Sequence, residues 1–194
     1  TRLGNEIRMS YIVADQLGKS FGSGAAAVHA VSDLSFRIAP GEFVAIMGES
    51  GAGKSTLLGI LGAMSAPTTG RLHVDGIDVY ALDQDRLADF RREYLGFVFQ
   101  SFHLVPYLSV IENVMLPLAV SRQGHTEKRR RAKDALAQVG LDGKADRLPG
   151  EISGGEKERV AVARAIVNEP PVLLADEPTG ILDFGNSREI MRMF

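Results

Sequence analysis

The sequence has 194 residues, a formal net charge of −2, 45% hydrophobic residues and 24% charged residues. That apolar share is enough for a globular core, and the near-neutral charge excludes the strongly basic field typical of proteins held to nucleic acid by charge. The sequence contains no cysteine, which excludes disulfide bonds, thiolate catalysis and cysteine-ligated zinc within these residues.

The N-terminal part of the chain predicts an antiparallel β layer. Residues 7–38 read as strands separated by the turn GSGAAA, and the second strand alternates apolar and polar positions. The apolar run FVAIM (43–47) predicts a buried parallel strand, which leads through a glycine-rich loop into a helix over about 54–63. The segment RLHVDGIDV predicts a β-hairpin that turns at Asp75 and Gly76.

The rest of the chain alternates predicted helices with short apolar strands. A charged amphipathic helix is expected over 83–94, followed by a buried strand over 95–99. Helices are then expected in SVIENVMLPLAV, over 126–140 and after SGG, before the strand PVLLAD and a last helix from about Asn186. We therefore predict one α/β domain over 1–194, with a mainly parallel core sheet, an N-terminal antiparallel layer and an inserted helical subdomain at about 101–160.

The loop between the expected strand and helix at 43–63 has the pattern of a phosphate-binding loop. GESGAGKS fits G-x-x-x-x-G-K-[ST], a pattern that points successive backbone N–H groups, and the positive end of a helix dipole, at phosphate oxygens. Lys54 would reach the outer phosphates and the Ser55 hydroxyl could ligate Mg²⁺, while the Glu49 side chain would point outward. The expected ATP-binding residues of this loop are Gly48, Glu49, Ser50, Gly51, Ala52, Gly53, Lys54, Ser55 and Thr56. The alternative is a glycine turn with an incidental Lys-Ser pair.

A second set of candidate residues lies where two apolar strands end. VLLADE ends in Asp176, which could hold Mg²⁺ through water, and Glu177, which could polarise a water for attack on the terminal phosphate. Gln100, after the strand GFVF, could contact Mg²⁺ or the attacking water without adding charge, and could sense the γ-phosphate. The alternative is a pair of buried strands that simply end in solvated polar residues.

These stretches resemble the nucleotide-binding subunits of ATP-binding cassette (ABC) transporters, which have a P-loop NTPase fold. The similarity covers nearly the whole chain and comprises GESGAGKST (Walker A), FVFQ (Q-loop), ISGGE (signature), VLLADE (Walker B) and ILD (D-loop), in the family's order. The stretches around these motifs resemble the bacterial branch serving lipoprotein release, macrolide efflux and antimicrobial-peptide export. Five motifs in order predict this family with high specificity.

The resemblance implies a site shared between two copies of the chain. In this family two subunits pair head to tail, and ATP lies between the Walker A of one and the signature of the other. The signature residues that would contact the partner's ATP are Ser153, Gly154, Gly155 and Glu156. Asp183 would reach across the same interface, and Phe21 would stack on the adenine unless it is a core residue.

The resemblance also implies a function. It predicts an ATP- and Mg²⁺-dependent ATPase that binds a second copy of itself and an integral membrane permease, docked at about 100–117, on the cytoplasmic inner face of the cell membrane. The alternative is a non-transport relative in DNA repair or translation; a P-loop kinase or GTPase would not explain Ser-Gly-Gly. The basic run EKRRRAKD is expected to be a solvated helix face, so no nucleic-acid partner is predicted.

One family feature is missing from the sequence. The family's switch histidine lies about thirty residues beyond the Walker B acid, and none of His29, His73, His103 and His125 occupies that place. We therefore expect a C-terminally truncated cassette that binds nucleotide but hydrolyses ATP weakly or not at all.

Overall fold

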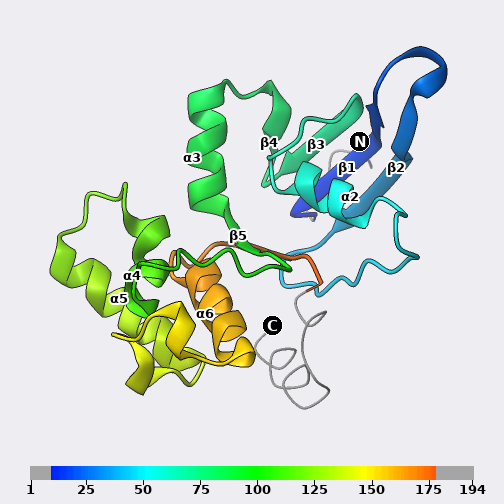
Figure 1. Ribbon diagram of the computed structural model, residues 1–194. Helices are drawn as coiled ribbons and strands as arrows, with labels where there is room; N and C mark the ends of the chain where they lie inside the picture. The colour runs from blue at the N-terminus through cyan, green and yellow to red at the C-terminus, as the bar shows by residue number, and fades with distance from the viewer. Residues whose placement is uncertain (1–9, 178–194) are drawn as a thin grey trace. The chain divides into compact units, whose positions relative to one another are not determined.

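The computed structural model describes residues 10–177, and the chain forms two compact units that divide between Arg91 and Arg92 (Figure 1). Helix α3 (Gln84–Tyr94) contains this division. The first unit contains an antiparallel sheet, and the second contains a parallel pair of strands with three α-helices. None of the helices formed by residues 10–177 is both long enough and apolar enough to span a membrane.

The first unit is built on a four-stranded antiparallel sheet with the order β2-β1-β3-β4. Its strands are β1 (Ile12–Phe21), β2 (Val28–Ile38), β3 (Thr69–Val74) and β4 (Ile77–Asp78). Ile12 and Ala14 of β1 and Leu72 and Val74 of β3 are buried at alternate positions, as expected for strands with one face on a core. The predicted hairpin is confirmed: Asp75 and Gly76 both have positive φ, at 51° and 76°, which suits a two-residue turn.

Helix α2 (Lys54–Leu61) follows the glycine-rich loop and is held by apolar contacts. Leu57, Leu58, Ile60 and Leu61 are buried, which leaves the N-terminal turn as the more accessible end of the helix. The Tyr80 hydroxyl donates to the carbonyls of Ile60 at 2.6 Å and Ser65 at 2.9 Å, and so fixes the other end. This arrangement anchors the loop from its C-terminal side.

The segment before the glycine-rich loop differs from the sequence prediction. Residues 43–47 are irregular, and Phe43 and Met47 are 63% and 90% exposed, so the prediction of a buried parallel strand is wrong for the described structure. A buried strand needs neighbours on both edges and cover on both faces. Among residues 10–177, no strand of either sheet pairs with this segment, which removes the physical reason for it to be extended and buried.

The second unit contains the parallel strands β5 (Leu95–Val98) and β6 (Val172–Ala175), paired from Leu95↔Val172 to Val98↔Ala175. Helices α4 (Val110–Met115), α5 (His125–Gln138) and α6 (Gly154–Ile166) pack on one another around one apolar core. The largest fully buried apolar side chains of this core are Val98, Ile111, Leu118, Leu136 and Leu141.

Of two helices predicted in the second unit, one is shorter than expected and the other is present as expected. The helix expected in SVIENVMLPLAV ends after Met115 and continues as a 3₁₀ turn over Leu116–Leu118, because Pro117 cannot donate a backbone hydrogen bond. The predicted helix over 126–140 is present, and Gly140 follows it with a φ of 69°. The helical subdomain at about 101–160, inserted in a single domain, stays a prediction.

Candidate functional site

The glycine-rich loop of the first unit has the backbone of an anion-binding turn. Gly51 and Gly53 have φ angles of 82° and 85°, a conformation that L side chains rarely adopt. A Cβ at Gly53 would lie 2.1 Å from the backbone oxygen of Ala30, whereas a Cβ at Gly51 would meet open space. Gly53 also caps α2, whose first turn carries no acidic residue. The loop therefore keeps the positive end of the helix accessible and free of competing negative charge.

Lys54 lies over this loop. Its ammonium donates to the carbonyl oxygens of Gly48 and Glu49, each at 2.9 Å, so it closes the loop on itself from the first position of α2. Glu49 is exposed. The amine is thus held by weakly basic carbonyls alone in the contacts seen here, which a phosphate oxygen could replace. Ser55 and Thr56 follow within the first turn of the helix.

The parallel strand pair of the second unit brings the other candidate residues together. Asp176 and Glu177 follow β6 directly, and Gln100 lies two residues beyond β5. The Asp176 N–H donates to Val98 C=O at 2.9 Å, which extends the pairing past the end of β6. Carboxyl ends of parallel strands meet at one edge of a sheet, which is the usual place for a site in this fold class.

At that edge Gln100 and Glu177 touch. The Gln100 amide Nε2 donates to Glu177 Oε2 at 2.8 Å. Glu177 has a φ of 47°, an unusual backbone conformation for a residue with a side chain. The structure therefore joins the two residues that the sequence assigned to the same chemistry, and the chain bends sharply where the candidate base lies.

The signature segment forms the start of α6. Ser153 is the N-cap: its hydroxyl oxygen accepts from Glu156 N–H at 3.3 Å, and its own N–H donates to Glu156 Oε2 at 2.7 Å. The hydrogen bond from the Ser153 N–H, together with Lys144 at 3.3 Å, holds the pKa of Glu156 below its ordinary value. Sequence reasoning missed this capping box, although Ser-x-x-Glu before an apolar run is its known signature.

The Ser153 hydroxyl also makes a side-chain hydrogen bond to the Glu156 carboxylate, so it would have to exchange that partner to donate to an anion. The hydroxyl lies at the N-terminus of a 13-residue helix beside Gly154 and Gly155. The segment could therefore donate to an anion from both side chain and backbone.

Two further predicted residues have different outcomes. Phe21 is the last residue of β1 and is 49% exposed, with the Lys19 ammonium 5.2 Å from its ring centroid. The ring is therefore available for stacking and is not a core residue. Asp183 lies outside the described residues.

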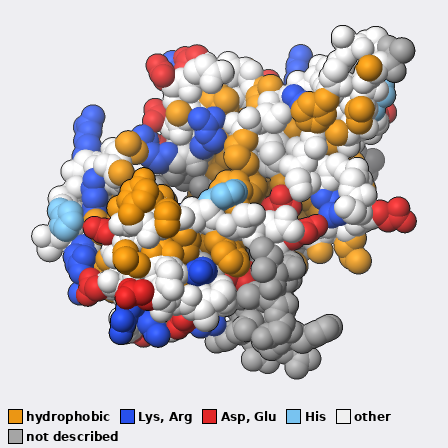
Figure 2. All heavy atoms as spheres, viewed as in Figure 1, with side chains coloured by type: hydrophobic (Ala, Val, Ile, Leu, Met, Phe, Trp, Pro, Cys, Tyr) orange, Lys and Arg blue, Asp and Glu red, His pale blue; other side chains and the backbone are white. Residues whose placement is uncertain are grey.

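Apolar and charged groups at the surface bear on the predicted partners. Apolar side chains reach the face shown in Figure 2, and Tyr107, in the loop proposed to dock a permease, is 80% exposed. On α5, Arg130 pairs with Glu127 at 2.6 Å and with Asp134 at 2.7 Å, so its positive charge is matched within its own helix. Among residues 10–177, no group of three or more histidine, cysteine, aspartate or glutamate side chains could hold a metal ion.

Comparisons with known proteins agree with these motifs. A family profile described as "ABC transporter" matches residues 31–180. The macrolide export ATP-binding/permease protein MacB of Rhodopseudomonas palustris is 45% identical over 184 residues, which cover 95% of this chain and 28% of that protein. The lipoprotein-releasing system ATP-binding protein LolD of Bordetella pertussis is 46% identical over 170 residues, with 88% of this chain and 74% of that protein covered.

One more relative and one solved structure complete the comparison. The uncharacterized ABC transporter ATP-binding protein YvrO of Bacillus subtilis is 43% identical over 94% of this chain and 80% of its own length. A dimeric ATP-binding cassette solved in a post-hydrolysis state with ADP and Pi superposes with a TM-score of 0.86, at 40% identity, and the match covers 94% of this chain and 80% of that one. The chain thus spans about a quarter of MacB and most of the two ATP-binding proteins.

Proposed function

The chain belongs to the ABC transporter family, and from this membership we propose that it is the ATP-binding and ATP-hydrolysing subunit that drives transport through a membrane permease. The observation that carries the proposal is the loop at 48–56, in which left-handed glycines lead into a helix whose first turn has no acidic residue and whose Lys54 amine donates to two loop carbonyls. The proposed cassette is one domain, with a helical subdomain at about 101–160 inserted in the core.

ATP is the proposed ligand of the glycine-rich loop. The backbone N–H groups from Gly48 to Thr56 would surround the phosphates, and Lys54 would exchange its two carbonyl contacts for phosphate oxygens. The exposed ring of Phe21 would stack on the adenine.

Mg²⁺ is the proposed metal. The oxygen donors of Ser55, Gln100 and Asp176 suit a hard divalent cation and would hold it directly or through water. When bound, the ion would neutralise charge that develops on the phosphate oxygens.

Glu177 is the proposed general base for hydrolysis. Its carboxylate would accept a proton from the water that attacks the terminal phosphate, and the Gln100 amide would orient that carboxylate or the water.

A second copy of the chain is the proposed partner at the signature. Ser153, Gly154 and Gly155 would donate to the γ-phosphate bound by the other copy, Glu156 would hold the cap, and Asp183 would contribute across the same interface. The dimeric state of the solved cassette supports this pairing. The names of the relatives support a permease partner and export or lipoprotein release as the process served. The proposed location is the cytoplasmic face of the membrane, where the permease would hold the subunit.

The test uses the full-length protein and two substitutions. Lys54→Ala should weaken ATP binding by about tenfold or more, because it removes the charged donor to the outer phosphates. Glu177→Gln should keep ATP binding, abolish most hydrolysis and trap an ATP-bound dimer in size-exclusion chromatography with light scattering. A Glu177→Gln protein that stays monomeric with saturating ATP and Mg²⁺ would contradict the two-copy mechanism.

A further inference from the structure

The loop that follows Gln100 has a backbone conformation that needs outside support. Phe102 and His103 are consecutive non-glycine residues with φ angles of 57° and 47°. Left-handed conformations are costly for residues with a side chain, so a pair of them persists only where the surroundings hold it. The loop's own backbone supplies part of this support, since Phe102 N–H donates to Phe99 C=O at 3.1 Å.

One side chain of α6 adds support from outside the loop. Arg164 Nη1 donates to His103 C=O at 2.7 Å, and Nη2 donates to Phe102 C=O at 2.5 Å. The flat guanidinium presents two donors in a fixed geometry, and here each donor contacts one of two successive carbonyls. Arg164 is partly buried and its burial lowers the pKa of the guanidinium, yet arginine stays protonated in proteins, so both hydrogen bonds are charge-assisted.

The second half of the same loop is held by a buried amide. Asn113 of α4 is fully buried; its Oδ1 accepts from Val105 N–H at 2.7 Å, and its Nδ2 donates to the carbonyls of Val105, Leu108 and Ser109 at 3.0–3.1 Å. Every hydrogen-bonding group of that amide is used within the loop and the start of α4. Asn113 therefore fixes residues 105–109 to α4, and Arg164 fixes residues 102–103 to α6.

The position of Arg164 along α6 means that its hydrogen bonds to Phe102 and His103 connect the loop to the helix that carries the signature. Helix α6 begins at Ser153, and Arg164 lies eleven residues further on, roughly 16 Å along a helix that rises 1.5 Å per residue. The other end of the loop begins at Gln100, whose amide contacts Glu177. A single rigid helix thus has the signature at one end and the loop after Gln100 near the other.

We propose that Arg164 is a positioning residue that ties the loop after Gln100 to the helix that carries the signature, so that a nucleotide-driven movement of either is passed to the other. The two carbonyl contacts act as a rigid link because both donors belong to one planar guanidinium and both acceptors belong to adjacent residues. The link consists of the two Arg164 hydrogen bonds, which the structure shows. That nucleotide moves the linked segments rests on the proposed function.

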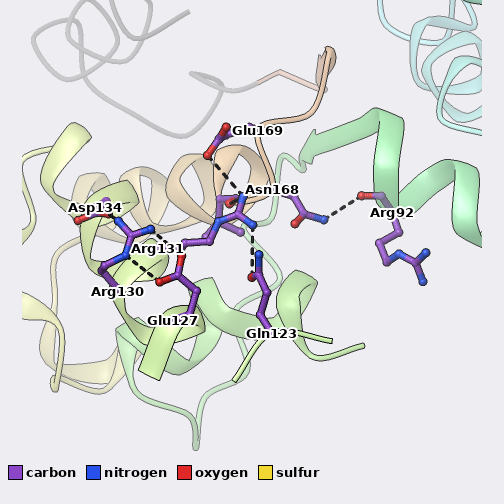
Figure 3. A network of polar contacts seen from close by, with 9 residues as sticks. Arg92, Gln123, Glu127, Arg130, Arg131, Asp134, Asn168 and Glu169 are labelled. Carbon is purple, nitrogen blue, oxygen red and sulfur yellow. Dashed lines mark hydrogen bonds and ion pairs between the residues drawn. The ribbon is translucent and has the colours of Figure 1, made fainter. Parts of the chain in front are cut away.

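The chain offers a matched control for this arginine. Arg131 of α5 is also largely buried, with 18% of its side chain exposed, and it donates to Val167 C=O at 2.9 Å and contacts Glu169 and Gln123 (Figure 3). It therefore stabilises the packing of α5 on the end of α6 through a backbone carbonyl, and these partners all lie outside residues 101–109. Loss of this arginine should affect stability without affecting the loop.

The experiment compares Arg164→Lys with Arg131→Lys in the full-length protein. Lysine keeps the charge but cannot present two coplanar donors. For Arg164→Lys we expect the amides of residues 101–104 to exchange hydrogen about tenfold faster, kcat for ATP hydrolysis to fall about tenfold, and KM for ATP to stay within about twofold. For Arg131→Lys we expect all three quantities to stay within about twofold of the wild type, even if the melting temperature falls equally.

Three results would overturn the proposal. The first is an Arg164→Lys protein whose loop exchange is unchanged, and the second is an Arg131→Lys protein with the same losses, which would reduce Arg164 to a packing residue. The third needs no variant: in the wild-type protein, ATP should alter exchange in residues 101–104 and in α6 together, and a response in only one of them contradicts the link. If the wild type fails to bind ATP, the proposed function fails, while exchange in the nucleotide-free variants still tests Arg164.

Discussion

The side-chain amide of Gln100 donates a 2.8 Å hydrogen bond to the carboxylate of Glu177. These residues are 77 positions apart in the chain, and the parallel pairing of β5 with β6 brings them together. The contact occupies one carboxylate oxygen of the proposed base. The other carboxylate oxygen can still take a proton from water, so Gln100 would hold the proposed base in position while it acts.

Replacement of Gln100 tests this relationship. In Gln100→Ala the carboxylate of Glu177 loses its partner, and we expect kcat for ATP hydrolysis to fall by about tenfold with KM for ATP changed less than about threefold. Steady-state kinetics of the full-length protein measure both constants. Gln138→Ala, an exposed position on α5, serves as the control. A rise in kcat for Gln100→Ala would show that the contact only restrains the base.

Two glycines of the phosphate-binding loop form a matched pair. Both Gly51 and Gly53 have left-handed φ angles, but a Cβ at Gly53 would lie 2.1 Å from the Ala30 carbonyl oxygen whereas one at Gly51 would meet nothing within 4 Å. We expect Gly51→Ala to cost about 1 kcal/mol of unfolding free energy from backbone strain alone, and Gly53→Ala to cost about 3 kcal/mol or more. Urea denaturation followed by circular dichroism measures the difference. Equal losses would show that the loop can move away from β2.

The capping box at the signature predicts a graded series. Ser153→Ala should lower the unfolding free energy by about 1 kcal/mol, because it leaves an N-terminal N–H of α6 without its acceptor. Glu156→Gln should cost less than Glu156→Ala, because a side-chain amide oxygen can still accept from Ser153 N–H. Denaturant titrations at neutral pH give the order of the three variants, and a Glu156→Gln loss as large as that of Glu156→Ala would contradict the box.

The same box has a defined pH dependence. The pKa of Glu156 is lowered in the folded protein, so the ionised carboxylate binds its partners better than the acid does. Its contribution to stability is therefore present above the ordinary glutamate pKa and is lost as the pH falls through the lowered value. The stability difference between wild type and Glu156→Ala should shrink below about pH 4, which thermal melts across pH measure.

A second glutamate of α6 has a pKa that is raised in the folded protein, in contrast to that of Glu156. Glu158 is 1% exposed, neither carboxylate oxygen has a hydrogen-bond partner among residues 10–177, and burial raises its pKa to about 7. The folded state therefore favours the protonated form of Glu158. As the pH rises from the ordinary glutamate pKa through about 7, the unfolded state ionises more easily than the folded state, and the free energy of unfolding falls.

Replacement of Glu158 by its neutral isostere measures that cost. Glu158→Gln should stabilise the protein by about 2–3 kcal/mol more at pH 8.5 than at pH 5, because the fixed cost of burying an amide cancels between the two pH values. Chemical denaturation at both values gives the comparison, with Glu93→Gln, an exposed position with 61% of its side chain in contact with solvent, as the control. A Glu158→Gln effect independent of pH would show that the carboxyl is ionised in the folded state at both values.

The incorrect prediction of a buried strand at residues 43–47 shows what a local apolar pattern can and cannot predict. An apolar run of five residues forms a buried strand only if other strands pair with it. The run itself does not identify which segments of the chain would be those strands. In the described structure Phe43 and Met47 are exposed because no strand of residues 10–177 pairs with them. The hairpin at Asp75 and Gly76 succeeded for the opposite reason, since a two-residue turn with positive φ is settled by adjacent residues.

The sequence by itself determined the motifs, most helices and strands, and the residue types of the candidate sites, because phosphate loops, caps and strand ends depend on residues close together in the chain. Only the tertiary structure decided that the amide of Gln100 meets Glu177, that Arg164 holds the carbonyls of Phe102 and His103, and that the Glu158 carboxylate is buried with no hydrogen-bond partner among residues 10–177. These contacts join segments up to 77 residues apart or depend on how helices pack, and spacing along a chain carries no information about either.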